Sequence, residues 1–222
     1  MSATEIISLV SAIFTGVSVA CVIYGARNVH LARLQFKQDH ERSRREQAIR
    51  LFTVWNQCMS AETIAVRNLA ESLEFNEIKQ IIDSEPYVSI TYSGKIGRYL
   101  RGIFGDDWLK KKGLEEEESK AKDMKPVDLE YSEVIKIRWL LVRLLNHLET
   151  ICSAWHYKVA HEEMILEQFL YLVAPEKGHE LLKKARDAGG GKHTWPNIER
   201  FHNKIVESSK ATEAKKALGE DD

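Results

Sequence analysis

The feature that most constrains this chain is an uncharged stretch of twenty-one residues near its start, Ile6–Ala26. In a helix, at about 1.5 Å per residue, a stretch of this length just crosses a hydrocarbon core of roughly 30 Å. No other part of the 222 residues combines this length with an absence of charge. The sequence therefore predicts a transmembrane anchor over residues 1–27, followed by a water-soluble part.

The charges on either side of this stretch predict its orientation. Glu5 is the only charged side chain before it, and a cleaved signal peptide would begin with basic residues instead. Under the positive-inside rule the basic side stays in the cytoplasm. We therefore expect a single-pass protein of the bacterial inner membrane with its N-terminus outside. The basic residues that follow the span are Arg27, Arg33, Lys37, Arg42, Arg44, Arg45 and Arg50.

One face of the expected membrane helix carries only small side chains. Small residues recur there at every fourth position, namely Ser8, Ala12, Gly16 and Ala20. This spacing lets two helix backbones approach closely, although small residues also occur by chance in membrane helices. The chain has no second membrane helix to receive this face. A second copy is therefore the expected partner, which predicts a homo-oligomer.

A helical stalk is expected over residues 28–59, because no proline or glycine interrupts this segment. A heptad frame over it has apolar ends, but its middle carries Gln38, Glu41 and Arg45, which makes a poor dry coiled coil. Two interpretations stay open. The favoured one is a solvated basic helix beside anionic lipid headgroups. The other is a ring of stalks around a wet axis that these three residues line.

The sequence predicts an all-α helical bundle in the cytoplasm over residues 60–208. Ser60 is an expected N-cap, and the strongest helix runs from about Asp128 to Lys158. Its apolar residues step by three and four, as in a helix at the centre of a bundle. Arg138 and Arg143 within it exclude a second membrane crossing. The apolar stripe consists of Val134, Ile137, Leu141, Leu144, Leu148, Ile151 and Trp155.

The remaining segments follow from turn signals and composition. Tyr87–Tyr92 has a strand-like composition, but a lone strand has nothing to pair with, so a helix reaching Phe104 is expected there. The charged stretch Lys110–Lys125 predicts a mobile loop at about 110–126. Further helices are expected at about 76–82, 160–173 and 175–189, and from Pro196 onward, with a frayed tail at 209–222.

Composition and motifs argue against several kinds of chemistry. With 32 basic and 33 acidic residues, no net field attracts nucleic acid. The three cysteines are scattered and predict reduced thiols. His156 and His161 are spaced five apart, off the step that aligns two metal ligands on a helix. Gly189–Gly191 with Lys192 lacks the spacing of a phosphate loop and predicts a helix stop. We expect no metal and no cofactor.

Two arginine–histidine pairs resemble the motif of helical-bundle ribonucleases, in which a histidine follows an arginine at short spacing. Arg143 and His147 lie one turn apart in the long helix. Arg186 and His193 are separated by six residues, three of them glycines. Each pair fits imperfectly, and caps or surface ion pairs explain them equally well. An RNA-cleaving enzyme that uses one of these pairs is therefore the alternative reading, and only this reading implies an RNA partner.

A polar line accompanies the apolar stripe of the long helix and consists of Asn146, Glu149 and Ser153. Partly buried polar groups need partners. We expect Trp55 with Asn56, and Arg67, to meet this line across the bundle.

Several short motifs are similar to those of a family of uncharacterised bacterial proteins with a membrane anchor and an all-helical cytoplasmic domain. The likeness covers most of residues 1–208. Proteins of this family are similar to accessories found near phage-defence genes, such as the Cas13b-associated protein that assembles a membrane pore. It implies a membrane-associated defence role with an unknown cytoplasmic protein partner. The matching positions are 51–56 (LFTVWN) with Arg67, 144–149 (LLNHLE), and Arg186 with 195–197 (WPN).

The leading expectation from the sequence is a non-enzymatic membrane protein that self-associates through its span. Its output would be an oligomeric pore or a scaffold at the membrane, and its helical domain would sense a partner. The membrane-tethered ribonuclease is the runner-up.

Overall fold

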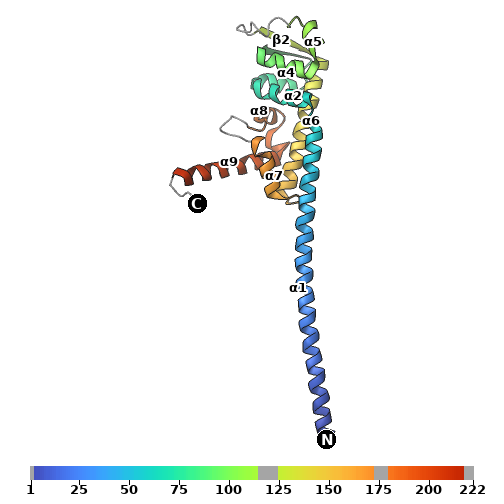
Figure 1. Ribbon diagram of the computed structural model, residues 1–222. Coiled ribbons are helices and arrows are strands. Elements are labelled where there is room, and N and C mark those ends of the chain that lie inside the picture. The colour runs from blue at the N-terminus through green and yellow to red at the C-terminus, as the bar shows by residue number, and fades with distance from the viewer. Residues whose placement is uncertain (1–2, 115–124, 173–179, 218–222) are drawn as a thin grey trace. The chain divides into compact units, whose positions relative to one another are not determined.

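The computed structural model describes residues 3–114, 125–172 and 180–217 (Figure 1), with side chains at residues 14, 16–114, 126–172 and 180–208. The chain divides into two compact units, residues 1–46 and 47–222, which are described separately. The division lies within the segment expected to form the stalk. Most described residues are helical, as the sequence predicts.

The first unit is the N-terminal part of helix α1 (Ala3–Cys58), which runs without a break through the expected span and stalk. Its described apolar side chains from Phe14 onward are largely exposed. Short-range ion pairs link Arg42 to Glu46 at 2.8 Å and Arg44 to Glu41 at 3.4 Å. Ser8 and Ala12 of the small face lie outside the described side chains. Among the side chains that are described, no helix is both long enough and apolar enough to cross a membrane.

The second unit is a helical bundle with a small sheet. It contains the C-terminal end of α1, which packs by aromatic contacts of Phe52 and Trp55 with Phe169. The other elements, in order, are α2 (Ala61–Ser72), α3 (Phe75–Ile82), β1 (Tyr87–Tyr92), α4 (Gly94–Phe104), α5 (Asp106–Lys111), β2 (Lys125–Glu130), α6 (Tyr131–His156), α7 (Glu162–Phe169), η1 (Leu170–Leu172), α8 (Lys183–Ala188), η3 (Gly191–His193) and α9 (Pro196–Ala217).

Helix α6 is the centre of the core, and the predicted helix over 128–158 is confirmed apart from its ends. It packs against α2, α3, α7 and α9. Every residue of the predicted apolar stripe is buried. The side chains that surround it, such as Leu69, Phe169 and Phe201, have no exposed surface. The stripe therefore organises this unit as its three- and four-residue spacing predicts.

Two helix boundaries were also predicted correctly. The Ser60 hydroxyl accepts a hydrogen bond from Thr63 N at 3.2 Å and caps α2. Pro196 begins α9, whose backbone stays helical to Ala217, beyond the expected start of the frayed tail. Gly189 ends α8, while the expected start of that helix at Pro175 lies outside the described residues.

The predicted helix over 87–104 is confirmed in its second half, where α4 ends at Phe104, and is wrong in its first half. Residues 87–92 form β1, which pairs antiparallel with β2, so that Val88 faces Leu129 and Ile90 faces Val127. Side chains of β1 alternate between exposed and buried, as expected for a strand with one face on a core. The partner strand is more than thirty residues away in the sequence, behind the charged stretch, and for this reason the strand seemed to have nothing to pair with.

The bounds of the predicted loop at about 110–126 agree with the structure to within one or two residues, and its described ends pack against the fold. Helix α5 continues to Lys111, Leu114 is buried, and Lys125 begins β2. Lys112 explains part of this order, because its ammonium donates to Asp128 O at 3.0 Å and pairs with Glu133 at 3.1 Å. The rest of the charged stretch, residues 115–124, lies outside the described residues.

Candidate functional site

The polar line on α6 holds the start of α9. Both carboxylate oxygens of Glu149 accept from Asn197 N at 3.1 Å, and one of them accepts from Ile198 N at 3.0 Å. The Asn197 side-chain amide also donates to Glu149, at 2.7 Å. A carboxylate at a helix N-terminus satisfies free N–H groups and interacts favourably with the helix dipole. Glu149 is thus an internal anion that docks α9 onto α6.

The neighbours of Glu149 on α6 complete this contact. Trp195 Nε1 donates to Asn146 Oδ1 at 3.0 Å, and Asn197 Nδ2 donates to Ser153 Oγ at 2.7 Å. The polar line therefore has partners, as expected, but they come from residues 195–198. The expected meeting of Arg67 with Glu149 is wrong, because Arg67 Nε donates to Glu71 Oε1 at 3.3 Å, one turn along α2.

Arg186 is a fully buried cation that ties three segments together. Its Nε donates to Leu181 O at 2.9 Å and its Nη2 to Glu180 O at 3.2 Å. Its Nη1 pairs with the carboxylate of Glu199 on α9. Every nitrogen of the guanidinium thus has a partner, which compensates for the large cost of burying a charge.

Cys152 lies in the electrostatic field of this polar cluster. Burial raises the pKa of its thiol well above the usual value, and the negative charge of Glu149 raises it further, while Arg186 acts in the opposite direction. A thiol of this kind stays protonated near neutral pH and is unreactive. This agrees with the expectation of a reduced, structural cysteine.

Two consecutive buried leucines near Arg186 adopt a left-handed backbone. Leu181 has φ 49° and Leu182 has φ 56°. For a residue with a side chain this conformation costs on the order of 1–2 kcal/mol. Arg186 holds the preceding carbonyls and so helps to fix the segment. Because neither residue is glycine or asparagine, no local sequence signal marks this turn, and sequence reasoning missed it. Strained backbone of this kind is often found at binding sites.

The strained leucines line a hollow next to Arg67. The hollow is small, with a volume of about 10 Å³. Its surface is almost entirely apolar, so Arg67 contributes mainly the aliphatic part of its side chain. The lining residues are Trp55, Arg67, Leu144, Leu148, Leu172, Leu181 and Leu182. A space of this size holds at most about one water molecule, so it is a packing defect beside the strained leucines.

A second hollow, of about 70 Å³, shares Leu182 with the first and is partly open to solvent. Its wall is more polar and carries charges of both signs. The lining residues are Ala70, Glu71, Glu180, Leu182, Lys183 and Lys184. Both lysines are engaged, since Lys183 pairs with Asp187 at 2.5 Å and Lys184 donates to Leu73 O at 2.7 Å. The pKa of the Lys183 ammonium is raised, and its hydrogen bond to Asp187 is the largest cause.

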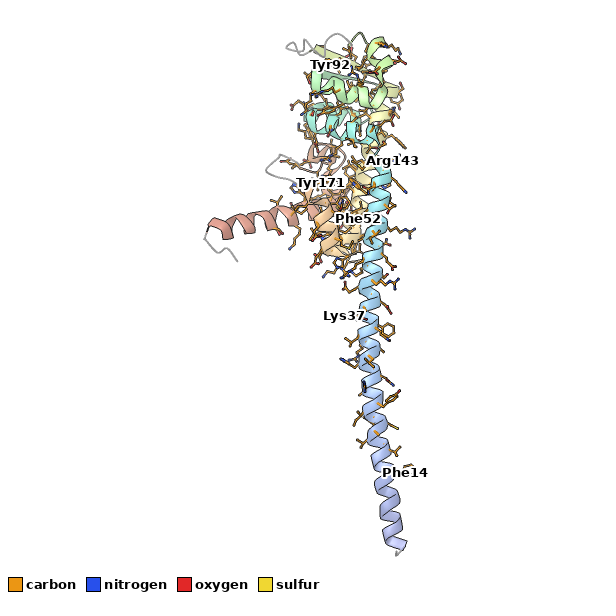
Figure 2. All side chains as sticks on the ribbon, viewed as in Figure 1. Phe14, Lys37, Phe52, Tyr92, Arg143 and Tyr171 are labelled. Atoms are coloured by element: carbon orange, nitrogen blue, oxygen red, sulfur yellow. The ribbon has the colours of Figure 1, made fainter. Side chains whose placement is uncertain are left out.

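The two arginine–histidine pairs differ in their surroundings. Arg143 is exposed (Figure 2) and lies over the ring of Trp139, 5.2 Å from its centroid. His147 is half-buried one turn further along α6. Arg186 is fully bonded within the core, whereas His193 is exposed on η3. The guanidinium of Arg186 is therefore buried and out of reach of a substrate.

None of the other predicted positions is a lining residue of the hollow. Asn56 is exposed on α1, and Gln38 and Arg45 are exposed in the first unit, where Glu41 pairs with Arg44. Gly16 and Ala20 of the small face are exposed as well.

No metal site is found in the described parts of the chain. They contain no cluster of three or more His, Cys, Asp or Glu side chains arranged to hold an ion. His161 instead caps α7 by accepting from Met164 N at 3.5 Å, and His156 packs its ring against Trp155 and Tyr157.

Comparisons with known proteins leave the site to be interpreted from its own geometry. No protein-family model, no curated protein and no solved structure matches the chain.

Proposed function

We propose that this protein is a membrane-anchored homo-oligomer whose helical bundle binds a partner in the cytoplasm. The observation that carries the proposal is the exposure of large apolar side chains along the first unit. Phe14, Val22 and Phe36 expose 73%, 71% and 74% of their surface. Covering a side chain of this size stabilises by roughly 1.5–3 kcal/mol. A lone helix with so much apolar surface needs lipid, a second helix, or both.

The arrangement of charge supports lipid around the first part of α1. The uncharged stretch ends at Ala26, and the basic residues begin with Arg27. Arg42 and Arg45 are exposed on the stalk, where anionic headgroups attract basic side chains. Under the positive-inside rule, this charge pattern favours a cytoplasmic bundle and an N-terminus outside.

The small face supports self-association. A Cβ added to Gly16 would meet no atom of the chain within 4 Å. The space beside Gly16 is therefore open in the single chain, and a helix from a second copy fits the small-residue spacing. Assembly would bring several stalks together and place Gln38, Glu41 and Arg45 near a common axis. Either a pore or a membrane scaffold results, and the family resemblance adds a role in phage defence.

The experiment compares two glycines of the same helix. Gly16→Leu adds bulk to the small face. Gly25→Leu is the matched control, because nine residues at about 100° each place Gly25 on the opposite side of the helix. Neither glycine has an intrachain neighbour within 4 Å, so neither change disturbs the folded chain. We expect overproduced wild-type protein and Gly25→Leu to admit a membrane-impermeant dye, and Gly16→Leu to admit none.

The same cells separate the alternatives. A pore requires dye entry that depends on Gly16 and not on Arg143. RNA decay that is lost in Arg143→Ala and retained in Gly16→Leu would establish the ribonuclease instead. A scaffold predicts membrane-bound protein with neither dye entry nor RNA decay. Recovery of the whole chain in the soluble fraction would refute the anchor.

A further inference from the structure

We propose that the bundles of neighbouring copies bind each other head to tail, a basic patch on α6 of one copy against an acidic patch on α7 and η1 of the next. This rests on the proposed function, because the membrane helix first brings the copies together, and it adds a second contact in the cytoplasm. The basic patch consists of Arg138, Trp139 and Arg143. The acidic patch consists of Glu163, Glu167, Leu170 and Tyr171.

The basic patch presents a large aromatic ring to solvent. Trp139 is 57% exposed, and the exposed guanidinium of Arg143 lies over its ring, 5.2 Å from the centroid. The cation–π contact favours one arrangement of the two side chains. Tryptophan and arginine are also the residues most enriched among those that dominate binding energy at protein interfaces. An exposed pair of this kind is suited to contact another protein.

The cations of this patch have no carboxylate partner. Between residues 134 and 148, α6 carries three basic residues and no acidic one. Lys136 pairs with Glu62 at 2.9 Å. Arg138 only donates to a backbone carbonyl of α3, at 2.7 Å, and within the described residues neither it nor Arg143 forms an ion pair. Two exposed guanidinium groups are therefore available to an acidic partner.

The acidic patch has the complementary composition. Residues 162–172 contain three glutamates and no basic residue. Glu163 and Glu167 are exposed one turn apart on α7 and form no ion pair in the part of the chain that the structure describes. Leu170 and Tyr171 follow one turn later and are each 52% exposed. Spacings of three and four place these side chains on neighbouring positions of one surface.

The two patches match in charge and in apolar surface. A guanidinium can donate two parallel hydrogen bonds to a carboxylate, and opposite charges on facing surfaces favour the correct partner and register. Trp139 can lie against Leu170 and Tyr171 in the same contact. RNA or an anionic membrane needs a broader positive surface, whereas the chain has a net charge of −1. A second copy is therefore the occupant that the charges favour.

A contact of this size is sufficient because the copies are already tethered. Exposed ion pairs contribute little individually, but linkage through the membrane helix gives an effective concentration on the order of millimolar. Since the two patches differ, each copy can bind one neighbour through each patch. The membrane helices hold the copies together, so the loss of this contact should leave assembly and dye entry intact.

The test is photo-crosslinking of the full chain in the membranes of the producing cells, with p-benzoylphenylalanine in place of Trp139. We expect a covalent dimer, with the cross-link within residues 162–172 of the second copy by mass spectrometry. Arg143→Glu and Glu167→Arg should each reduce the dimer about fivefold, and their combination should restore most of it. Glu207→Arg is the matched control, because this exposed glutamate on α9 lies outside both patches, and it should leave the yield unchanged.

Circular dichroism checks that each variant is folded, and native mass spectrometry should give all of them the oligomer of wild type. The inference is overturned if position 139 cross-links only to its own chain, to RNA, to lipid or to another protein. It is also overturned if the single charge reversals leave the dimer unchanged or if the double reversal does not restore it. Monomeric wild type would refute the proposed function as well, whereas an oligomer without this cross-link refutes the inference alone.

Discussion

Large apolar side chains are buried in residues 47–222 and exposed in residues 1–46. Leu69, Phe169 and Phe201 of the second unit are covered completely by their own chain, whereas Phe14, Val22 and Phe36 of the first are mostly uncovered. A buried apolar side chain contributes to folding stability, and an exposed one can contribute only through something outside the chain. The contrast teaches that the second unit is stabilised from within, while the apolar side chains of the first gain no such stabilisation from their own chain.

The largest expected loss of stability comes from a substitution in the core of the second unit. Phe201 packs edge-on against Trp155 and has no exposed surface. Phe201→Ala should therefore lower the free energy of unfolding by about 3–5 kcal/mol, the usual cost of a large core cavity. Urea unfolding followed by tryptophan fluorescence measures this change.

Phe36→Ala is the matched change in the first unit. Phe36 is exposed, so its loss should alter the unfolding of the second unit by less than about 0.5 kcal/mol. Equal losses for the two phenylalanines would contradict the contrast between the units.

A smaller effect is expected where α9 docks on α6. Glu149→Ala removes the acceptor of Asn197 N and Ile198 N and leaves these donors partly buried without a partner. Loss of hydrogen bonds to a charged group lowers the free energy of unfolding by about 1.5–3 kcal/mol. The same urea experiment should show this loss, while Glu167→Ala, on the exposed face of α7, should change stability by less than about 0.5 kcal/mol. A stability of Glu149→Ala equal to that of wild type would show that the carboxylate does not hold α9.

The smallest effect concerns the cap of α2. Ser60→Ala deletes the hydroxyl that accepts from Thr63 N and should cost about 1 kcal/mol. Ser60→Asp keeps an acceptor at the same position and should restore nearly all of the stability. Thermal unfolding of the two variants checks this, and equal melting temperatures would argue against the cap.

The sequence predicts those parts of the fold that depend on local signals. The α6 stripe repeats every three or four residues, Ser60 caps the helix that follows it directly, and Pro196 begins α9. Each signal lies within one or two helical turns of its consequence. Local chemistry is sufficient at these positions.

The parts that sequence reasoning missed depend on remote partners. The strand over 87–92 forms because β2, beyond a charged stretch, pairs with it. Leu181 and Leu182 are left-handed in a segment that Arg186 holds through the preceding carbonyls. The polar line on α6 was found in the sequence, but its partners were not, because a carboxylate can bond to an arginine or to a helix N-terminus equally well.

The central claim is that the first unit completes itself with another copy. The most direct measurement is native mass spectrometry of the full chain released from detergent, for wild type, Gly16→Leu and Gly25→Leu. We predict one defined oligomer for wild type and Gly25→Leu, and monomers for Gly16→Leu. Monomeric wild type, or an oligomer that Gly16→Leu leaves intact, would contradict the claim.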